Sequence, residues 1–368
     1  MRIPIFDLRV DEPDLKAELM GAFSRVLDHG RLFMGPEVEE FEEKIATNIG
    51  SRYAVGVGSG SSALYMALKA CGIGPGDEVI TTPLTWIITV NAIAACGATP
   101  VFADVREDFN IDPESIKVRI SKKTKAIVPM HYAGHMCEMD TICEIAEKNN
   151  LIVVEDAAQA FGATLNGKKA GSFSLAAGIS MNPMKVLAGY GEAGVVVTSD
   201  QEIYKRLTRL RHAGTTSDPK KNITNECLEV SLNHKMDTIN AALLIVALKH
   251  LPEKRKKREA VARRYDRELP EPIRRQGYLA EEVHGRYVYA VSVNARDELK
   301  HFLENKQIET KIFNEPLACD APVYKQYNNY PVPVARKMLE SNLILPSHDN
   351  LSDEQIAFVI DMCFDFLV

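Results

Sequence analysis

One lysine of this sequence lies in a setting suited to covalent chemistry. Lys185 stands among small and apolar residues in the run GISMNPMKVLAGYGEAG, residues 178–194, directly after a strand-like stretch. Removal from water favours the uncharged amine of a lysine, which can condense with a carbonyl group to form a Schiff base. Most lysines are solvated surface charges, so an ordinary surface position is the competing interpretation.

Asp156 is a second candidate, because it ends the hydrophobic run LIVVED at residues 151–156. A carboxylate at the end of a buried strand is costly without a cationic partner. It could be the counter-charge that keeps a heterocyclic nitrogen protonated, or it could cap the following helix. Glu155 should point to the other side of the strand, so the two carboxyl groups are not expected to share a proton.

A third candidate is the run GSGSS, residues 58–62, between a strand-like and a helical pattern. The free N–H groups and positive end of a helix that starts here would attract a phosphate group. The same residues also fit an ordinary helix N-cap. The run is neither a Walker loop nor GxGxxG, which argues against nucleoside triphosphates and dinucleotides.

The three features together match the needs of one cofactor. Pyridoxal 5'-phosphate (PLP) needs a helix N-terminus for its phosphate, an aspartate for its pyridine nitrogen and a lysine for its aldehyde. Trp86, the only tryptophan, would offer a flat surface to the cofactor ring, although a lone tryptophan more commonly packs in a core.

The elements that must position these residues alternate between strand and helix patterns. Strands are expected at residues 53–60, within 74–83, and at 98–105, 124–134 and 151–159, and helices at 61–72, 85–97 and 139–150. Near-continuous apolar strands separated by helices predict an α/β domain with a mostly parallel sheet between helices. Ligands bind at the carboxyl ends of such strands, where the candidate residues fall.

The pattern changes after about residue 235. Residues 236–269 predict one long helical stretch that is interrupted near Pro252, and the remainder suits a smaller α+β domain. A strand is expected at residues 288–293, a helix at 297–307 and a last helix from Ser352. We place the large PLP-binding domain at residues 1–245 and the small C-terminal domain at residues 246–368.

The composition limits the class of protein. The 368 residues include 44 Lys+Arg and 50 Asp+Glu, for a net charge of −6, which argues against a nucleic-acid binder. The basic run at residues 253–267 is interpreted mainly as a solvated helix face. No signal peptide or membrane span is expected. The seven cysteines form no CxxC or zinc-type cluster, so we expect reduced thiols, a cytoplasmic protein and no metal site.

Ordered segments along nearly the whole chain resemble one known family, the DegT/DnrJ/EryC1/StrS sugar aminotransferases of PLP fold type I. The segments are IPIFDLR, GRLFMGPEVEEFE, GSGSSAL, GIGPGDEVITTPLTW, GATPVFADV, TKAIVPMHYAG, VEDAAQAFGA, MKVLAGYGEAGVVVTSD and LNHKMDTINAAL. The resemblance implies the PLP fold of that family and a PLP-dependent transaminase.

The resemblance also implies roles for individual residues. Lys185 would bind the cofactor and carry protons, Asp156 would pair with the pyridine nitrogen, and Gln159 would lie beside the ring and its phenolic oxygen. The remaining matched positions are the stacking aromatic Trp86, the phosphate-binding Gly60, Ser61 and Ser180, and Asn233, which in the family reaches the phosphate from the neighbouring subunit. A homodimer with shared active sites is therefore expected.

The family's substrates would be L-glutamate as amino donor and a keto sugar linked to a nucleotide as acceptor. The run GYGEAG, residues 189–194, is nearer to the pattern of enzymes that act on 3-keto sugars than to that of 4-keto-sugar enzymes. A 4-keto sugar, a keto-cyclitol and a non-catalytic sensor with the same fold remain alternatives. Lys235 and the segment Phe313–Pro316 depart from the family pattern.

Overall fold

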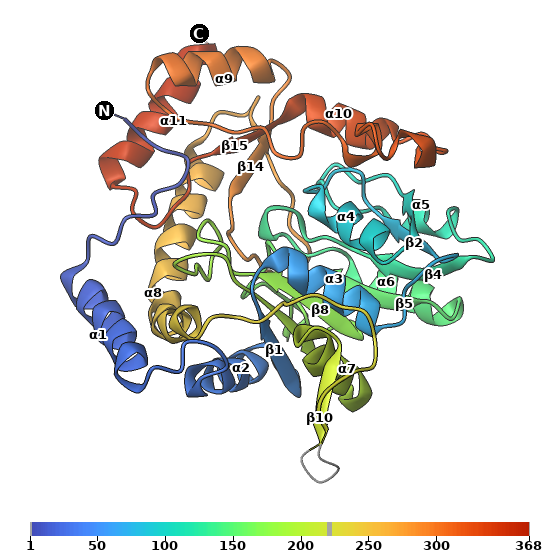
Figure 1. Ribbon diagram of the computed structural model, residues 1–368. Coiled ribbons are helices and arrows are strands. Elements are labelled where there is room, and N and C mark those ends of the chain that lie inside the picture. Colours follow the sequence, from blue (N-terminus) through green and yellow to red (C-terminus); the bar gives the residue numbers. More distant parts are fainter. Residues whose placement is uncertain (1, 219–222, 368) are drawn as a thin grey trace.

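The computed structural model describes residues 2–218 and 223–367 and is built around a seven-stranded sheet (Figure 1). The strand order is β1, β9, β8, β5, β4, β2, β3. Their bounds are β1 Tyr53–Val57, β2 Glu78–Thr81, β3 Thr99–Phe102, β4 Thr124–Val128, β5 Ile152–Asp156, β8 Ala176–Ser180 and β9 Gly194–Thr198. Only β9 runs opposite to the others in this sheet, pairing antiparallel with β1 and β8. The predicted α/β class with a mostly parallel sheet is confirmed.

Both faces of this sheet are buried. In β1, Val55 and Val57 belong to one core cluster and Ala54 to another, because successive side chains of a strand point to opposite faces. One cluster receives α3 (Gly60–Ala70) and α7 (Gln201–Arg211), and the other receives α2 (Pro36–Ile49) and α6 (Met139–Lys148). The other helices of this part are α1 (Pro13–His29), α4 (Ile88–Ala95), α5 (Pro113–Lys117) and the 3₁₀ turn η1 (Tyr132–Gly134).

Helix α8 (Thr238–Glu268) runs for 31 residues with Pro252 inside it, so the predicted interruption was wrong. Pro252 cannot donate a backbone hydrogen bond, and proline inside a helix costs roughly 3 kcal/mol. Residues on both sides of it, including Ala247, Leu251 and Val261, are buried against neighbouring elements. This packing holds both halves of the helix in line, so the helix continues through the proline.

The C-terminal part has its own sheet and core (Figure 1). Strands β12 (Arg274–Arg275), β14 (Tyr289–Ser292) and β15 (Asn342–Leu345) pair antiparallel. The helical elements are α9 (Arg296–Asn305), η3 (Ala318–Asp320), η4 (Lys325–Tyr327), α10 (Pro333–Ser341) and α11 (Asp353–Leu367). The expected strand at 288–293 and the helices at 297–307 and after Ser352 are thus present. Ile3 is fully buried in this core, and α8 crosses residue 245, so the division at 245/246 stays a proposal.

Two small strand pairings complete the fold. Strand β13 (Glu282–Val283) pairs with β6 (Thr164–Leu165), which also pairs with β7 (Lys168–Lys169). This sheet brings a segment of the C-terminal half onto the loops of the large sheet. Strands β10 (Thr215–Asp218) and β11 (Ile223–Cys227) pair antiparallel at the lower edge of Figure 1. In the part of the chain that the structure describes, no helix is long and apolar enough to cross a membrane.

Candidate active site

The candidate residues gather where the parallel strands of the large sheet end. Gly60 follows β1, Asp156 is the last residue of β5, and Ser180 is the last residue of β8, with Lys185 five residues further on. Because the carboxyl ends of parallel strands meet at one edge of a sheet, these residues face a common region. The candidate residues thus lie at the carboxyl ends of the strands, where the sequence placed them, and their roles stay predictions.

The start of helix α3 has the geometry that the predicted phosphate site requires. Ser59 is the N-cap, since its Oγ accepts the N–H of Ser62 at 3.1 Å, a role that the sequence did not assign to one particular serine. The N–H groups of Gly60 and Ser61 make no hydrogen bond within residues 2–218 and 223–367. Such first-turn N–H groups suit a phosphate.

Close packing against β8 and β9 fixes this helix start. A Cβ atom on Gly60 would lie 2.5 Å from Ser180 Cβ, and one on Gly194 would lie 2.5 Å from the Ser59 carbonyl oxygen. Only glycine allows these approaches. Gly194 was not among the predicted site residues, although its place at the start of β9 opposite Ser180 makes it part of the same packing.

Asp156 is buried, with 5% of its surface exposed. Its Oδ2 accepts the Thr89 hydroxyl at 2.7 Å, and its Oδ1 accepts the Ala158 N–H at 3.1 Å. Burial raises the pKa of Asp156, while the bonds from Thr89 and Ala158 and the charge of Lys185 oppose that rise. A buried carboxyl with a raised pKa is suited to a cationic partner, such as a protonated ring nitrogen. Thr89 was missed because nothing in the sequence distinguishes it from other helix threonines.

Glu155, next to Asp156, has separate partners. Its carboxylate accepts the N–H groups of Gly171 and Phe173 and the Ser174 hydroxyl. His131 Nε2 lies 3.1 Å from Glu155 Oε2, and both side chains are fully buried. The expectation that Glu155 and Asp156 do not share a proton agrees with these separate hydrogen bonds.

Lys185 is half-buried in a tight turn. Its backbone N–H donates to the Asn182 carbonyl at 2.8 Å, and the Gly189 N–H donates to the Met181 carbonyl at 2.8 Å. The Lys185 Nζ lies 4.1 Å from the ring centroid of Tyr287, a residue that sequence reasoning missed because it lies about a hundred positions away. The amine is therefore held within the site rather than on an open surface.

Gln159 and Trp86 present complementary surfaces. The Oε1 of Gln159 accepts the Ala133 N–H at 2.8 Å, which leaves its NH₂ group as the end that can donate to a ligand. Trp86 is 63% exposed and lies in the loop before α4. The alternative that this tryptophan packs in a core is wrong, because most of its surface is exposed.

Asn233 is exposed, and its Oδ1 accepts the N–H and the Nζ of Lys235, each at 3.3 Å. The adjoining His234 carbonyl accepts the N–H of Gly58 at 2.9 Å. The segment is therefore attached to the loop before α3 of its own chain. The expected contribution of Asn233 to a neighbouring subunit stays a prediction.

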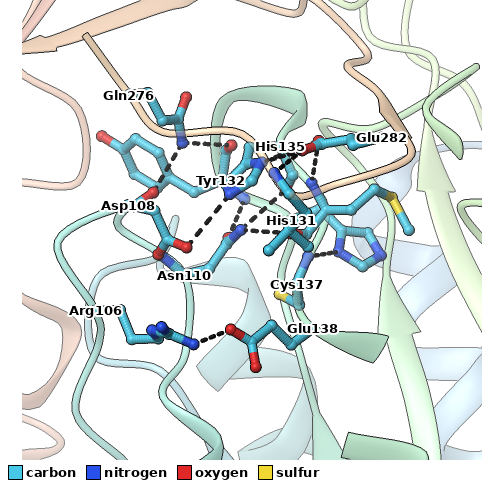
Figure 2. A network of polar contacts seen from close by, with 12 residues as sticks. Arg106, Asp108, Asn110, His131, Tyr132, His135, Cys137, Glu138, Gln276 and Glu282 are labelled. Carbon is cyan, nitrogen blue, oxygen red and sulfur yellow. Dashed lines mark hydrogen bonds and ion pairs between the residues drawn. The ribbon is translucent and has the colours of Figure 1, made fainter. Parts of the chain in front are cut away.

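A polar network connects the C-terminal segment 276–288 to the loops around η1 and Asp108 (Figure 2). His135 Nδ1 lies 2.7 Å from Glu282 Oε2, and its Nε2 lies 3.3 Å from Asp108 Oδ2. Burial alone would lower the pKa of His135, but the bonds to Asp108 and Glu282 raise it to about 9. Gln276 Nε2 also donates to the carbonyls of Asp108 and Tyr132. We call His135, Asp108 and Glu282 the His135 cluster.

The residues present fit PLP. The free N–H groups of Gly60 and Ser61 suit its phosphate, the buried Asp156 suits its pyridine nitrogen, and the half-buried amine of Lys185 suits its aldehyde. All seven cysteines are free thiols, as expected.

Comparison with known proteins gives consistent matches along the whole chain. A model of the DegT/DnrJ/EryC1/StrS aminotransferase family matches residues 13–363. A pleiotropic regulatory protein of Geobacillus stearothermophilus is 35% identical over 100% of this chain and 99% of its own length. The dTDP-3-amino-3,6-dideoxy-alpha-D-galactopyranose transaminase of Aneurinibacillus thermoaerophilus is 34% identical, over 98% of each chain. The crystal structure of S. venezuelae DesV with a ketimine intermediate superposes with a TM-score of 0.92, at 35% identity, covering 99% of this chain and 98% of that chain.

Proposed function

Because this chain belongs to the DegT/DnrJ/EryC1/StrS aminotransferase family, we propose that it transfers the amino group of L-glutamate to C3 of a nucleotide-linked keto sugar. The chain is a PLP-dependent transaminase. Its place would be in amino-sugar biosynthesis for a surface polysaccharide or a glycosylated metabolite. The observation that carries the proposal is the convergence of Asp156, Lys185 and the free N–H groups of α3 at one edge of the sheet.

Each site residue has a task in this proposal. Gly60, Ser61 and Ser180 would hold the phosphate, Asp156 the pyridine nitrogen, and the free NH₂ of Gln159 the phenolic oxygen. Trp86 would cover a face of the ring. When bound, PLP supplies an electron sink for the carbon that loses its proton. Lys185 would then be the base that takes this proton and returns it at the acceptor carbon.

Two observations support amination at C3. The turn after Lys185 reads GYGEAG, nearer to the 3-keto-sugar pattern, and the relative from Aneurinibacillus thermoaerophilus is named for a 3-amino sugar. A 4-keto-sugar or keto-cyclitol acceptor is the alternative. The regulatory name of the relative from Geobacillus stearothermophilus favours a second candidate, a non-catalytic sensor, which the presence of Lys185, Asp156 and Gln159 opposes.

The working unit in this proposal is a cytoplasmic homodimer. Asn233 would reach the cofactor phosphate of the neighbouring subunit, so that each active site contains residues of both chains. No nucleic acid or membrane partner is proposed, in keeping with the net charge of −6.

An absorbance titration tests the function. The protein is reconstituted with PLP, and its visible band is recorded before and after L-glutamate and then after nucleotide-linked 3-keto sugars, 4-keto sugars and a keto-cyclitol. We expect glutamate to remove the band and a 3-keto sugar to restore it. Restoration by a 4-keto sugar or a keto-cyclitol alone would overturn the C3 assignment. A band that no amino donor changes would favour the sensor.

A further inference from the structure

The ring of Tyr287 lies against the amine of Lys185. The Lys185 Nζ is 4.1 Å from the ring centroid, well within the roughly 6 Å range of a cation–π contact. Tyr287 is buried, with 4% of its surface exposed. An ammonium over a desolvated aromatic face is more strongly held than at an exposed site.

Packing from several elements fixes the ring of Tyr287. The rings of Phe6 and Phe313 lie 6.3 Å and 6.0 Å from it. These contacts, together with its burial, leave the tyrosine ring little freedom to turn away from the lysine. The ring is therefore a fixed feature of the wall beside Lys185.

The backbone around Tyr287 is attached to the large sheet. Gly285 N–H donates to the Gly134 carbonyl at 2.8 Å. Gly134 has a φ of +97°, and a Cβ there would lie 3.1 Å from the N of Tyr287, so glycine allows this close approach. The His135 cluster adds a charged connection between the same two segments (Figure 2).

We propose that Tyr287 is a positioning residue for Lys185, whose ring face holds the lysine amine beside the reacting atoms whenever that amine is not bonded to the cofactor. The proposal rests on the proposed role of Lys185 as cofactor-binding base. A free lysine side chain has four rotatable bonds and would otherwise disperse. The ring confines the amine to one position beside the proposed cofactor site.

The test uses the apoprotein, so that it does not depend on any substrate. Lysines are reductively dimethylated with ¹³C-formaldehyde and a cyanoborohydride as hydride donor, and the Lys185 resonance is assigned by its loss in Lys185→Arg. Nuclei over an aromatic face are shielded, so we expect an upfield methyl resonance in the wild-type protein and in Tyr287→Phe. In Tyr287→Leu this resonance should move to the position of solvated dimethyllysine. The matched control is Tyr278→Leu, a tyrosine of the same segment that is 46% exposed, and it should leave the resonance in place.

A second readout is kinetic. In the reconstituted enzyme we expect Tyr287→Leu to lower kcat by about 2- to 30-fold, the range of a cation–π contact, with KM for the amino donor unchanged and Tyr287→Phe close to wild type. If the Lys185 methyl resonance of Tyr287→Leu stays at its wild-type upfield position, the proposal is overturned. If that variant does not fold, the absence of a nuclear Overhauser effect between the Lys185 methyl and Tyr287 ring protons of the wild-type protein would overturn it equally. A third outcome is possible, in which Tyr287→Leu loses the shielding but no amino donor changes the visible band of the reconstituted wild-type protein. That outcome would support the contact between Tyr287 and Lys185 and would reject only the transaminase role.

Discussion

Burial sets the chemistry of Asp156. The side chain has a hydroxyl and a backbone N–H as hydrogen-bond partners, yet its pKa is raised because desolvation outweighs them. A group whose pKa is higher in the folded than in the unfolded state contributes less stability as pH rises through the folded value. Above the folded-state pKa of Asp156, its buried charge therefore costs the apoprotein stability, and a cationic ring nitrogen would offset that cost.

Replacing Asp156 by asparagine should separate stability from activity. Asp156→Asn keeps the size of the side chain and removes the charge, and the Thr89 hydroxyl can accept where it now donates. We expect the apoprotein to be at least as stable as the wild type at pH 7 in urea unfolding. The rate of the half-reaction with glutamate should fall on the order of 100-fold or more, because a preorganised charge is lost. Asp14→Asn, at an exposed position, is the control; a wild-type rate in Asp156→Asn would contradict the role.

At the scale of elements, the sequence predicted the large sheet well, because its strands are continuous apolar runs and turn residues separate them from the helices. It predicted the start of α3 for the same local reason, whereas the binding of an anion there stays a prediction. Tyr287 could not be predicted, since its place beside Lys185 depends on how the segment 276–288 folds back onto η1. The interruption of α8 was expected from the local effect of Pro252, which tertiary packing overrides.

The junction of α3 and β8 gives a prediction about cofactor affinity. Gly60→Ala would place a Cβ 2.5 Å from Ser180 Cβ, so the helix start must shift away from β8. Losing one hydrogen bond to a charged phosphate, about 1.5–3 kcal/mol, should weaken PLP binding by roughly tenfold or more. Fluorescence titration of the apoprotein measures the affinity. Gly74→Ala, where the nearest atom is 4.0 Å from the added carbon, should bind PLP normally, and equal affinities in both variants would refute the argument.

The His135 cluster gives a pH dependence at the contact between η1 and β13. The pKa of His135 is raised from 6.5 to about 9 by its carboxylate partners. Its stabilisation is therefore fully present below about pH 6.5 and is lost as pH rises through about 9. The difference corresponds to about 3 kcal/mol. Urea unfolding between pH 6 and 10 should show this decline in the wild type and not in His135→Gln. His29→Gln, at an exposed position, should keep it, and an unchanged decline in His135→Gln would rule the cluster out as its source.

At the scale of the whole molecule, the proposed dimer predicts that two impaired variants restore activity when their chains are combined. If Asn233 completes the site of the neighbouring subunit, Lys185→Ala and Asn233→Ala homodimers should both be impaired. Unfolding and refolding them together, in equal amounts, makes about half of the dimers mixed. One site of each mixed dimer then has Lys185 from one chain and Asn233 from the other.

The mixture should therefore recover about a quarter of the wild-type activity per chain, with every intact site in a mixed dimer. If Asn233 served its own chain instead, every site in the mixture would lack one of the two residues, and no activity beyond that of the parents would appear. Refolding each variant alone controls for recovery by refolding itself. The segment that contains Asn233 is also bonded to Gly58 of its own chain. Asn233→Ala could therefore impair the site of its own chain by disturbing the start of α3. The mixing experiment distinguishes a site shared between two chains from a site within one chain, since only a shared site regains activity in a mixed dimer.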